Sequence, residues 1–166
     1  MKKLNVFLLI VLLLLLALVA VFFIGSRLSA EIHIVTAPAA EHPDAFASIQ
    51  NVLASGSAPQ QFTGSIPASP EGCTLMDVTI TLTNSGFIPA EWIDVSVTGL
   101  PGDIAVYSLT GAGSDIPARS SGQINLKLIT TESPSASRPL LLTYHVLGRS
   151  LSLRRLSLQA VAAALE

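Results

Sequence analysis

The chain is poor in charged residues, in aromatic residues and in cysteine. Of its 166 residues, 12 % are charged and 5 % are aromatic, whereas charged residues make up about 25 % of an average soluble domain. Its single cysteine, Cys73, excludes an intrachain disulfide framework. A formal net charge of −2 argues against a nucleic-acid-binding protein.

The sequence also lacks the motifs of common catalytic and metal sites. It contains no Gly-x-Ser-x-Gly, Ser-x-x-Lys or His-Glu-x-x-His pattern. The three histidines, His33, His42 and His145, have no zinc-ligand spacing with one another or with cysteine. Asp103 and Asp115 are isolated and do not make a calcium-binding loop. We therefore expect neither an enzyme nor a protein with a metal or other cofactor.

Hydrophobic residues, in contrast, are abundant and unevenly placed. They make up 50 % of the chain, and Leu4 to Ile24 form a run of 21 residues in which only Asn5 is polar. At about 1.5 Å per residue, a helix of this length spans roughly 31 Å, the thickness of the hydrocarbon core of a bilayer. We expect a cytoplasmic stub at residues 1–3 and a transmembrane helix at residues 4–25.

A secretory signal removed after export is the alternative. Its apolar region is shorter, about 7–15 residues, and small residues mark its cleavage site. Residues 28–30 offer a bulky leucine where a small residue is needed, and residues 37–39 lie far beyond the apolar run. The length of the run favours an uncleaved anchor.

The charges that flank the apolar run predict its orientation. Lys2 and Lys3 precede it, Arg27 follows it, and no further Lys or Arg occurs before Arg119. Positive residues next to a membrane span are retained in the cytoplasm. The N-terminus is therefore expected inside the cell and the rest of the chain outside.

Residues 26–72 are expected to hold a short strand, a helix and a linker. Residues 31–35 alternate polar and apolar side chains, as a strand does. Pro43 suits the first turn of a helix and Gly56 suits the position after its end, so we predict a helix at residues 43–54. Its apolar stripe consists of Phe46, Ile49, Val52 and Leu53. Residues 55–72 are rich in Ser, Gly, Pro and Gln, which predicts a loop.

Residues 73–158 show the alternation of an antiparallel β-sandwich. With the strand at residues 31–35, about seven strands follow one another with turn signals between them, and no alternation of strands and helices indicates a parallel sheet. The slip of the alternation at residues 154–156 suggests a β-bulge. We expect the large rings of Trp92 and Tyr144 to lie in the core. A binding role for Trp92 is the alternative and would require an exposed side chain. We expect Cys73 to be buried and inert rather than part of an intermolecular disulfide. Besides residues 31–35, the predicted strands are residues 74–82, 91–97, 104–109, 123–130, 140–147 and 151–158. Residues 159–166 are expected to form a tail.

The strand ends carry a family resemblance. Residues 78–86, with Pro89-Ala90 before the next strand, and residues 116–122 resemble bacterial extracytoplasmic immunoglobulin-like modules of the CARDB or NEW3 kind, and also the LEA14/WHy sandwich. The resemblance covers about residues 73–158. It implies an all-β, immunoglobulin-like sandwich without enzymatic activity, often part of cell-surface or envelope proteins. A true antibody-type domain is excluded because its cysteine pair is missing.

Charge of one sign is missing from a long stretch of the expected exported domain. Residues 28–118 contain nine acidic residues and no Lys or Arg, whereas residues 119–166 contain six Lys or Arg and two acidic residues. We favour mixing of these charges in space, because the connections of a sandwich cross between its sheets. The alternative hypothesis is a partner contact: Arg149, Arg154 and Arg155 on the last strand would bind an anionic envelope polymer or an acidic protein.

These features together favour a single-pass membrane protein with a non-enzymatic, extracytoplasmic sandwich, an interaction or structural component of a bacterial cell envelope. Two alternatives remain. The chain could be an accessory subunit of a membrane transport or secretion complex, or a secreted ligand-binding domain whose signal is cleaved. The bilayer, and a protein or polymer partner, are the expected contacts.

Overall fold

The segments in which apolar and polar side chains alternate form antiparallel strands. The computed structural model describes residues 2–24, 27–56, 60–63 and 67–158. Within these residues, the α-helices are α1 (Lys2–Ile24) and α2 (Pro43–Ser55), and Ala39–Glu41 form a short 3-10 helix. The strands of the described residues are β1 (Leu28–Pro38), β2 (Gln60–Thr63), β3 (Thr74–Asn84), β4 (Glu91–Val97), β5 (Asp103–Thr110), β6 (Ser120–Thr130), β7 (Arg138–Val146) and β8 (Arg149–Leu158).

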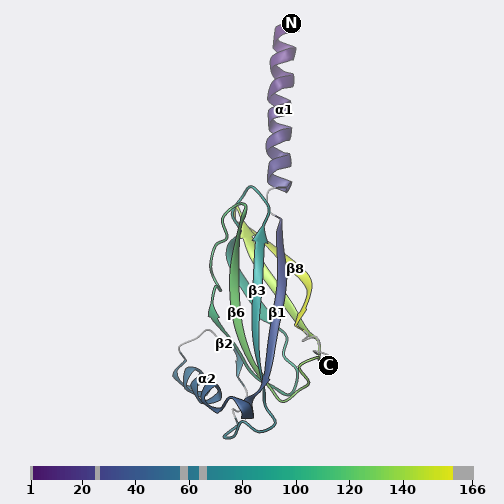
Figure 1. Ribbon diagram of the computed structural model, residues 1–166. Helices are drawn as coiled ribbons and strands as arrows, with labels where there is room; N and C mark the ends of the chain where they lie inside the picture. Colours follow the sequence, from purple (N-terminus) through teal and green to yellow (C-terminus); the bar gives the residue numbers. More distant parts are fainter. Residues whose placement is uncertain (1, 25–26, 57–59, 64–66, 159–166) are drawn as a thin grey trace.

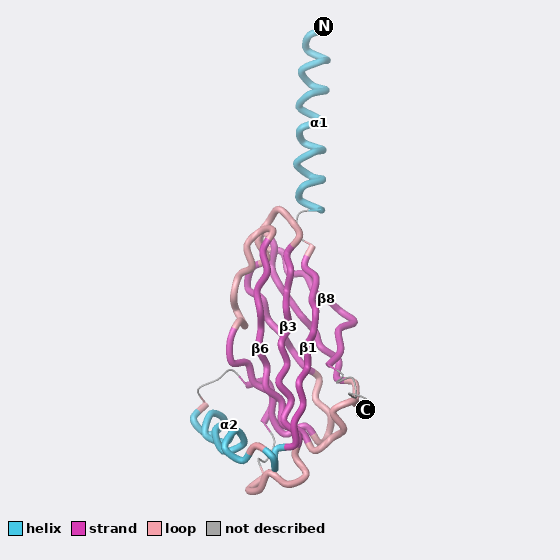
Figure 2. The backbone as a smooth tube through the Cα atoms, viewed as in Figure 1, coloured by secondary structure: helices cyan, strands magenta, loops and turns pink. Residues whose placement is uncertain are grey.

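Two sheets of unequal width face each other and form a β-sandwich (Figures 1 and 2). The wider sheet has the strand order β1-β3-β6-β5-β2, and the narrower sheet has the order β4-β7-β8. Strand β3 pairs along its whole length with β1 on one side and with β6 on the other. At the end nearest α1, Ala90, just before β4, bridges to Ile116 of the β5–β6 loop, and Ile93 of β4 forms backbone hydrogen bonds with Gly113 and Ser114 of the same loop.

The main core lies between the sheets and contains the apolar side chains that the alternation predicts to point inward. Each contributes about 1.5–3 kcal/mol when fully buried. Tyr144 lies among them, as expected. The inward residues of four strands are Met76, Val78, Ile80 and Leu82; Ile93, Val95 and Val97; Ile124, Leu126 and Leu128; and Leu140, Leu142 and Val146.

Helix α2 follows the local signals in the sequence. Pro43 lies in its first turn, and Gly56 ends it with φ 62°, in the left-handed region where glycine carries no Cβ penalty. The buried stripe of α2 packs into a second apolar cluster, separate from the main core, that also holds Cys73 and Tyr107. The predicted burial of Cys73 is confirmed.

Helix α1 stands at the opposite end of the sandwich from α2 and projects away from it (Figure 1). Its side chains are described from Leu4 to Ala20, and all of them are exposed. No helix within the described residues is long and apolar enough to be a candidate membrane span.

Two predicted segments differ from the structure because of pairing between distant strands. Strand β1 covers residues 28–38 rather than 31–35, since it pairs with β3 over its whole length. Residues 60–63, expected in a loop, form β2 against β5. The predicted bulge in β8 is confirmed: Leu140 pairs with Leu156 and Leu142 with Leu153, so β8 advances three residues while β7 advances two. The predicted tail, residues 159–166, lies outside the described residues.

The prediction that Trp92 packs in the core is wrong. Its side chain is 72 % exposed, because Ile93, Val95 and Val97 face the core and Trp92 lies on the opposite face of β4. The pairing of β4 with β7 also shifts register between Glu91 and Asp94. The backbone of Trp92 has φ 51°, and its N–H donates to Oδ1 of Asp115 at 3.0 Å.

A buried ion pair joins the two sheets at the end opposite α1. Arg138, the first residue of β7, has no exposed surface, and its Nε and Nη2 donate to Oδ1 of Asp103 at 3.0 and 2.7 Å. Nη2 also donates to Oγ1 of Thr130 at 3.2 Å. Burial alone would raise the pKa of Asp103, but hydrogen bonds from Arg138, the Leu100 N–H and Thr130, with the positive charge of Arg138, hold that pKa below its ordinary value.

Candidate functional site

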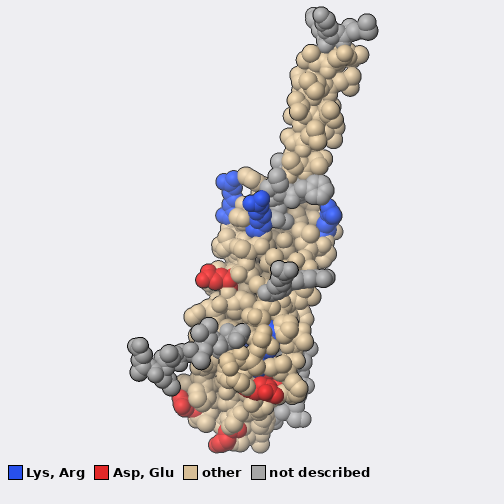
Figure 3. All heavy atoms as spheres, turned by 90° about the vertical axis from the view of Figure 1, so that its right-hand side faces the viewer, with Lys and Arg blue, Asp and Glu red and all other residues tan. Residues whose placement is uncertain are grey.

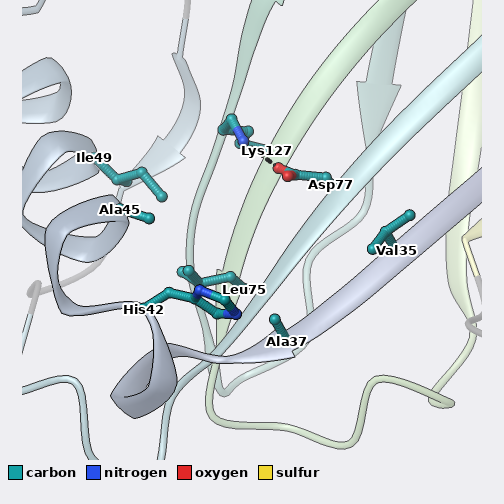
Figure 4. A pocket seen from close by; sticks show the side chains of 8 residues that line it. All are labelled: Val35, Ala37, His42, Ala45, Ile49, Leu75, Asp77 and Lys127. Carbon is teal, nitrogen blue, oxygen red and sulfur yellow. Dashed lines mark hydrogen bonds and ion pairs between the residues drawn. The ribbon is translucent and has the colours of Figure 1, made fainter.

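A groove of about 260 Å³ lies between α2 and the outer face of the wide sheet (Figure 4). Ala45 and Ile49 of α2 form one wall. Val35 and Ala37 of β1, with Leu75 of β3, form the other. Ile49 belongs to the buried stripe of α2, whereas Ala45 is exposed beside it.

Ionisable side chains lie in the same groove. Asp77 of β3 and Lys127 of β6 are paired residues of neighbouring strands, and their side chains form a partly exposed ion pair. His42 lies between the 3-10 helix and α2, at the end of the groove near Leu75 (Figure 4). Burial and the negative charge of Asp77 raise the pKa of the neighbouring Tyr107 to about 12.

This arrangement suits reversible contact better than covalent chemistry. The thiol near the groove belongs to Cys73, which is buried, and burial together with the charge of Glu71 raises its pKa, so the reactive thiolate is scarce. Within the described residues, no group of three or more His, Cys, Asp or Glu could hold a metal ion. The groove can therefore receive a small apolar side chain with a charge at its rim, and its ion pair would orient that charge.

The structure separates the three arginines predicted to contact a partner. Arg149 is exposed at the β7–β8 turn, at the end of the sandwich nearest α1. Arg154 and Arg155 lie at the bulge of β8, about 16–20 Å further along the strand at about 3.3 Å per residue. The side chains of Arg154 and Arg155 lie outside the described part of the chain.

The end of the sandwich nearest α1 has a fixed loop structure that sequence reasoning missed. Asn84, fully buried at the end of β3, donates from Nδ2 to the carbonyl oxygens of Ile88 at 2.8 Å, Ile116 at 3.3 Å and Pro117 at 3.2 Å. Its Oδ1 accepts a hydrogen bond from the N–H of Gly86 at 3.0 Å. One buried amide thus holds the β3–β4 and β5–β6 loops together.

Exposed side chains project from these loops. Phe87 is 60 % exposed, and the Cζ of Arg119 lies 4.3 Å from the centre of its ring, a cation–π contact. Exposed Trp92 lies at the same end. A signal for it was present in the sequence: Trp92 alternates with Ile93, so a strand that buries Ile93 turns its neighbour outward.

Comparison with known proteins leaves the family open. The sequence matches no protein-family profile and no curated protein. Among solved structures, a yeast GAE domain is 15 % identical and covers 52 % of this chain and 80 % of its own, with a TM-score of 0.42. A FixG-related protein from Vibrio parahaemolyticus is 11 % identical over 76 % of this chain and 92 % of its own, with a TM-score of 0.36. An uncharacterised β-sandwich protein from Clostridium difficile is 9 % identical over 77 % and 85 %, with a TM-score of 0.27.

Proposed function

We propose that this chain is a non-enzymatic, single-pass membrane protein whose β-sandwich lies outside the cytoplasm and serves as an interaction or structural component of a bacterial cell envelope. The observation that carries the proposal is the continuous apolar surface of α1. Its described side chains are all exposed and, apart from Asn5, apolar. Exposed apolar side chains of this extent favour an apolar surrounding, and a bilayer supplies one. The span itself is a proposal, since no helix of the described residues qualifies as a candidate membrane span.

The fold and the distribution of polar groups support the proposal. The sandwich resembles immunoglobulin-like envelope modules at its strand ends, residues 78–90 and 116–122, and we propose the CARDB or NEW3 kind, or the LEA14/WHy sandwich, as its relatives. The buried ionisable groups Asp103 and Arg138 satisfy each other, and Asp77 and Lys127 in the groove beside α2 form an ion pair as well. A binding role fits such a structure better than catalysis.

Fractionation of cells that express the full chain tests the anchor. The chain is expected in the membrane fraction after extraction with alkaline carbonate, with its sandwich digested by protease added outside the cell membrane. N-terminal sequencing of the mature protein tests the alternative of a cleaved signal. A mature protein that starts near Glu31 or Ala40 would establish the secreted alternative and overturn the anchor.

An accessory subunit of a membrane transport or secretion complex is the second candidate. In that case α1 itself would contact the partner helix. The leucine-rich sequence of α1 lacks the Gly-x-x-x-Gly pattern that brings two helices close together. Replacing α1 by an unrelated membrane helix is expected to preserve the partner in a pull-down assay, and loss of the partner would favour the subunit role.

We also propose a partner contact on β8 through Arg149, Arg154 and Arg155. An anionic envelope polymer or an acidic protein would supply the opposite charge. The triple substitution Arg149→Glu, Arg154→Glu and Arg155→Glu is expected to weaken envelope association at low ionic strength. If the folded triple variant associates with the envelope as strongly as the original chain, the proposed contact is wrong.

A further inference from the structure

We propose that the end of the sandwich nearest α1 docks on the surface of an anionic lipid bilayer, so that the domain lies against the membrane that α1 enters. The proposal rests on the membrane anchoring proposed above. It adds a second contact, made by the folded domain itself and separate from the groove beside α2.

Large apolar side chains project from this end into solvent. Phe87 and Trp92, 60 % and 72 % exposed, are the most exposed large apolar side chains of the described sandwich. Leu147, 52 % exposed, projects from the β7–β8 turn. Exposed aromatic rings next to a membrane helix are the groups enriched at the level of lipid headgroups, where one part of the ring is apolar and another stays wet.

The strand registers place these side chains at one end, although Phe87 lies in the β3–β4 loop, Trp92 at the start of β4 and Leu147 in the β7–β8 turn. The Cα partner of Asn84, three residues before Phe87, is Leu28 at the start of β1 and Ser120 at the start of β6. In the narrow sheet, Glu91 pairs with His145, so the start of β4 lies beside the end of β7. Trp92 directly follows Glu91, and Leu147 lies two residues after His145.

Backbone strain is concentrated at the same end. In the described part of the chain, three residues other than glycine have positive φ: Trp92 at 51°, Arg119 at 55° and Leu147 at 49°. Each conformation costs an L-residue about 1–2 kcal/mol. All three side chains are exposed, so burial does not offset that cost. The two-residue β7–β8 turn takes positive φ at both Leu147 and Gly148, and Trp92 lies in the register shift at the start of β4.

The exposed arginines of the described sandwich lie at the end nearest α1, where an anionic membrane surface would attract them. Arg27, Arg119 and Arg149 are exposed near α1. The acidic residues at this end are Glu91 and Asp115, whose Oδ1 already accepts the Trp92 N–H, and exposed Glu31 and Asp94 lie further along β1 and β4. The opposite end is acidic (Figure 3). An anionic leaflet therefore attracts one end and repels the other. The acidic side chains of the far end are those of Glu41, Asp44, Glu71 and Glu132.

A short tether holds this end close to the membrane. The N–H of Ser85 donates to the carbonyl oxygen of Arg27 at 3.0 Å, so the β3–β4 loop is bonded to a residue only three positions after Ile24, the end of α1. Three residues span at most about 10 Å. The headgroup layer on each side of the hydrocarbon core is about 5–8 Å thick. With α1 in the bilayer, the loop cannot lie far beyond the headgroups.

The test uses the fluorescence of Trp92, the only tryptophan in the sequence. The full chain is reconstituted into vesicles of phosphatidylcholine alone or of phosphatidylcholine and phosphatidylglycerol in equal parts. Quenching by aqueous iodide is measured, and so is quenching by lipids brominated near the headgroup. In vesicles with phosphatidylglycerol, we expect iodide quenching of Trp92 to fall several-fold and brominated lipids to quench it.

Two matched variants separate docking from simple proximity. In the variant Trp92→Phe with Ala47→Trp, the reporter moves to the exposed face of α2 at the far end and should stay accessible to iodide. The variant Arg119→Glu with Arg149→Glu should restore iodide access to Trp92. The same change of charge lower on β8, Arg154→Glu with Arg155→Glu, should leave Trp92 protected.

Flotation of the same vesicles distinguishes the two proposals. A chain that floats with the vesicles while Trp92 is as accessible to iodide as the reporter at position 47 keeps the anchor and overturns docking. A chain that does not float overturns the anchor and docking together. Protection in phosphatidylcholine alone that the Arg119 and Arg149 substitutions leave unchanged would overturn the proposed role of charge.

Discussion

At the scale of single residues, the guanidinium of Arg138 is a fully buried charge on which stability depends. It satisfies Asp103 and Thr130 from two other strands, and a buried charge without its partner is costly. We predict that Arg138→Met, which leaves the Asp103 carboxylate unpaired, lowers the free energy of unfolding by about 3–5 kcal/mol. Urea denaturation of the full chain in detergent, followed by circular dichroism, measures this loss.

The ion pair between Lys127 and Asp77 is the matched control for Arg138. Both of its side chains are partly exposed, and a pair screened by solvent contributes only about 0–1 kcal/mol. Lys127→Met should therefore change the unfolding free energy by less than about 1 kcal/mol. Equal losses in the two variants would show that burial does not determine the contribution of these pairs.

The lowered pKa of Asp103 predicts a loss of stability in acid. The folded pKa lies below the unfolded value of about 3.9, so the folded state binds this proton less readily than the unfolded chain. The stabilisation is present above about pH 4 and is lost as the pH falls through the folded pKa. Asp103→Asn should flatten the fall in unfolding free energy below about pH 4. A variant with the slope of the original chain in this range would contradict the assignment.

The Asp103–Arg138 pair also shows what sequence reasoning could not reach. Asp103 was expected to be isolated in a loop, but it begins β5, and Arg138 lies 35 positions further on. Nothing local in the sequence encodes a pairing between two sheets. Trp92 differs, because the alternation that placed Ile93 inward already placed Trp92 outward, and the large ring was wrongly given precedence over its position.

At the scale of elements, local signals predicted more than long-range pairing did. The bounds of α2 were predicted to within a residue, because Pro43 and Gly56 determine its ends through backbone geometry. The bulge in β8 was visible as a slip in the alternation. Strand β2 was not predicted, since its four residues become a strand only by pairing with β5.

The separate apolar cluster beneath α2 predicts that this helix can be loosened without unfolding the sandwich. Phe46 is buried in that cluster with Cys73 and Tyr107, and the main core contains none of them. Phe46→Ala should cost about 3–5 kcal/mol locally. We expect faster reaction of Cys73 with an aromatic disulfide reagent and a fall of the Tyr107 pKa from about 12 toward its ordinary 10.

Three measurements check the loosening of α2: thiol reaction rates, the absorbance of the phenolate against pH, and circular dichroism of the strands. Phe87→Ala is the control, because Phe87 is exposed at the other end of the sandwich and should leave both Cys73 and Tyr107 unchanged. Cooperative loss of strand signal together with the thiol response in Phe46→Ala would show instead that the two clusters unfold as one.

At the scale of the whole molecule, the charges are sorted by position along the sandwich rather than by half of the sequence. Mixing between the halves does occur, since Lys127 pairs with Asp77 and Arg138 with Asp103. These pairs neutralise the cations of the middle and far end. The exposed arginines of the described chain lie next to α1. The described acidic residues that are in neither ion pair are found along the sandwich as far as the end opposite α1 (Figure 3).

If the end nearest α1 docks on the membrane, docking should depend on the length of the segment that joins α1 to the sandwich. Inserting a flexible Gly-Ser segment of ten residues between residues 25 and 26 adds a mean reach of about 17 Å, against the present limit of about 10 Å. The effective concentration of the docking end at the membrane should fall, while α1 is unchanged. We predict that the lengthened chain still floats with anionic vesicles and that iodide quenching of Trp92 rises toward its value in phosphatidylcholine. An insertion of the same length in the far loop, after Ser135, should leave Trp92 protected. If the lengthened chain protects Trp92 as well as the original does, the short tether has no part in docking, and the affinity of the end itself must account for all of it.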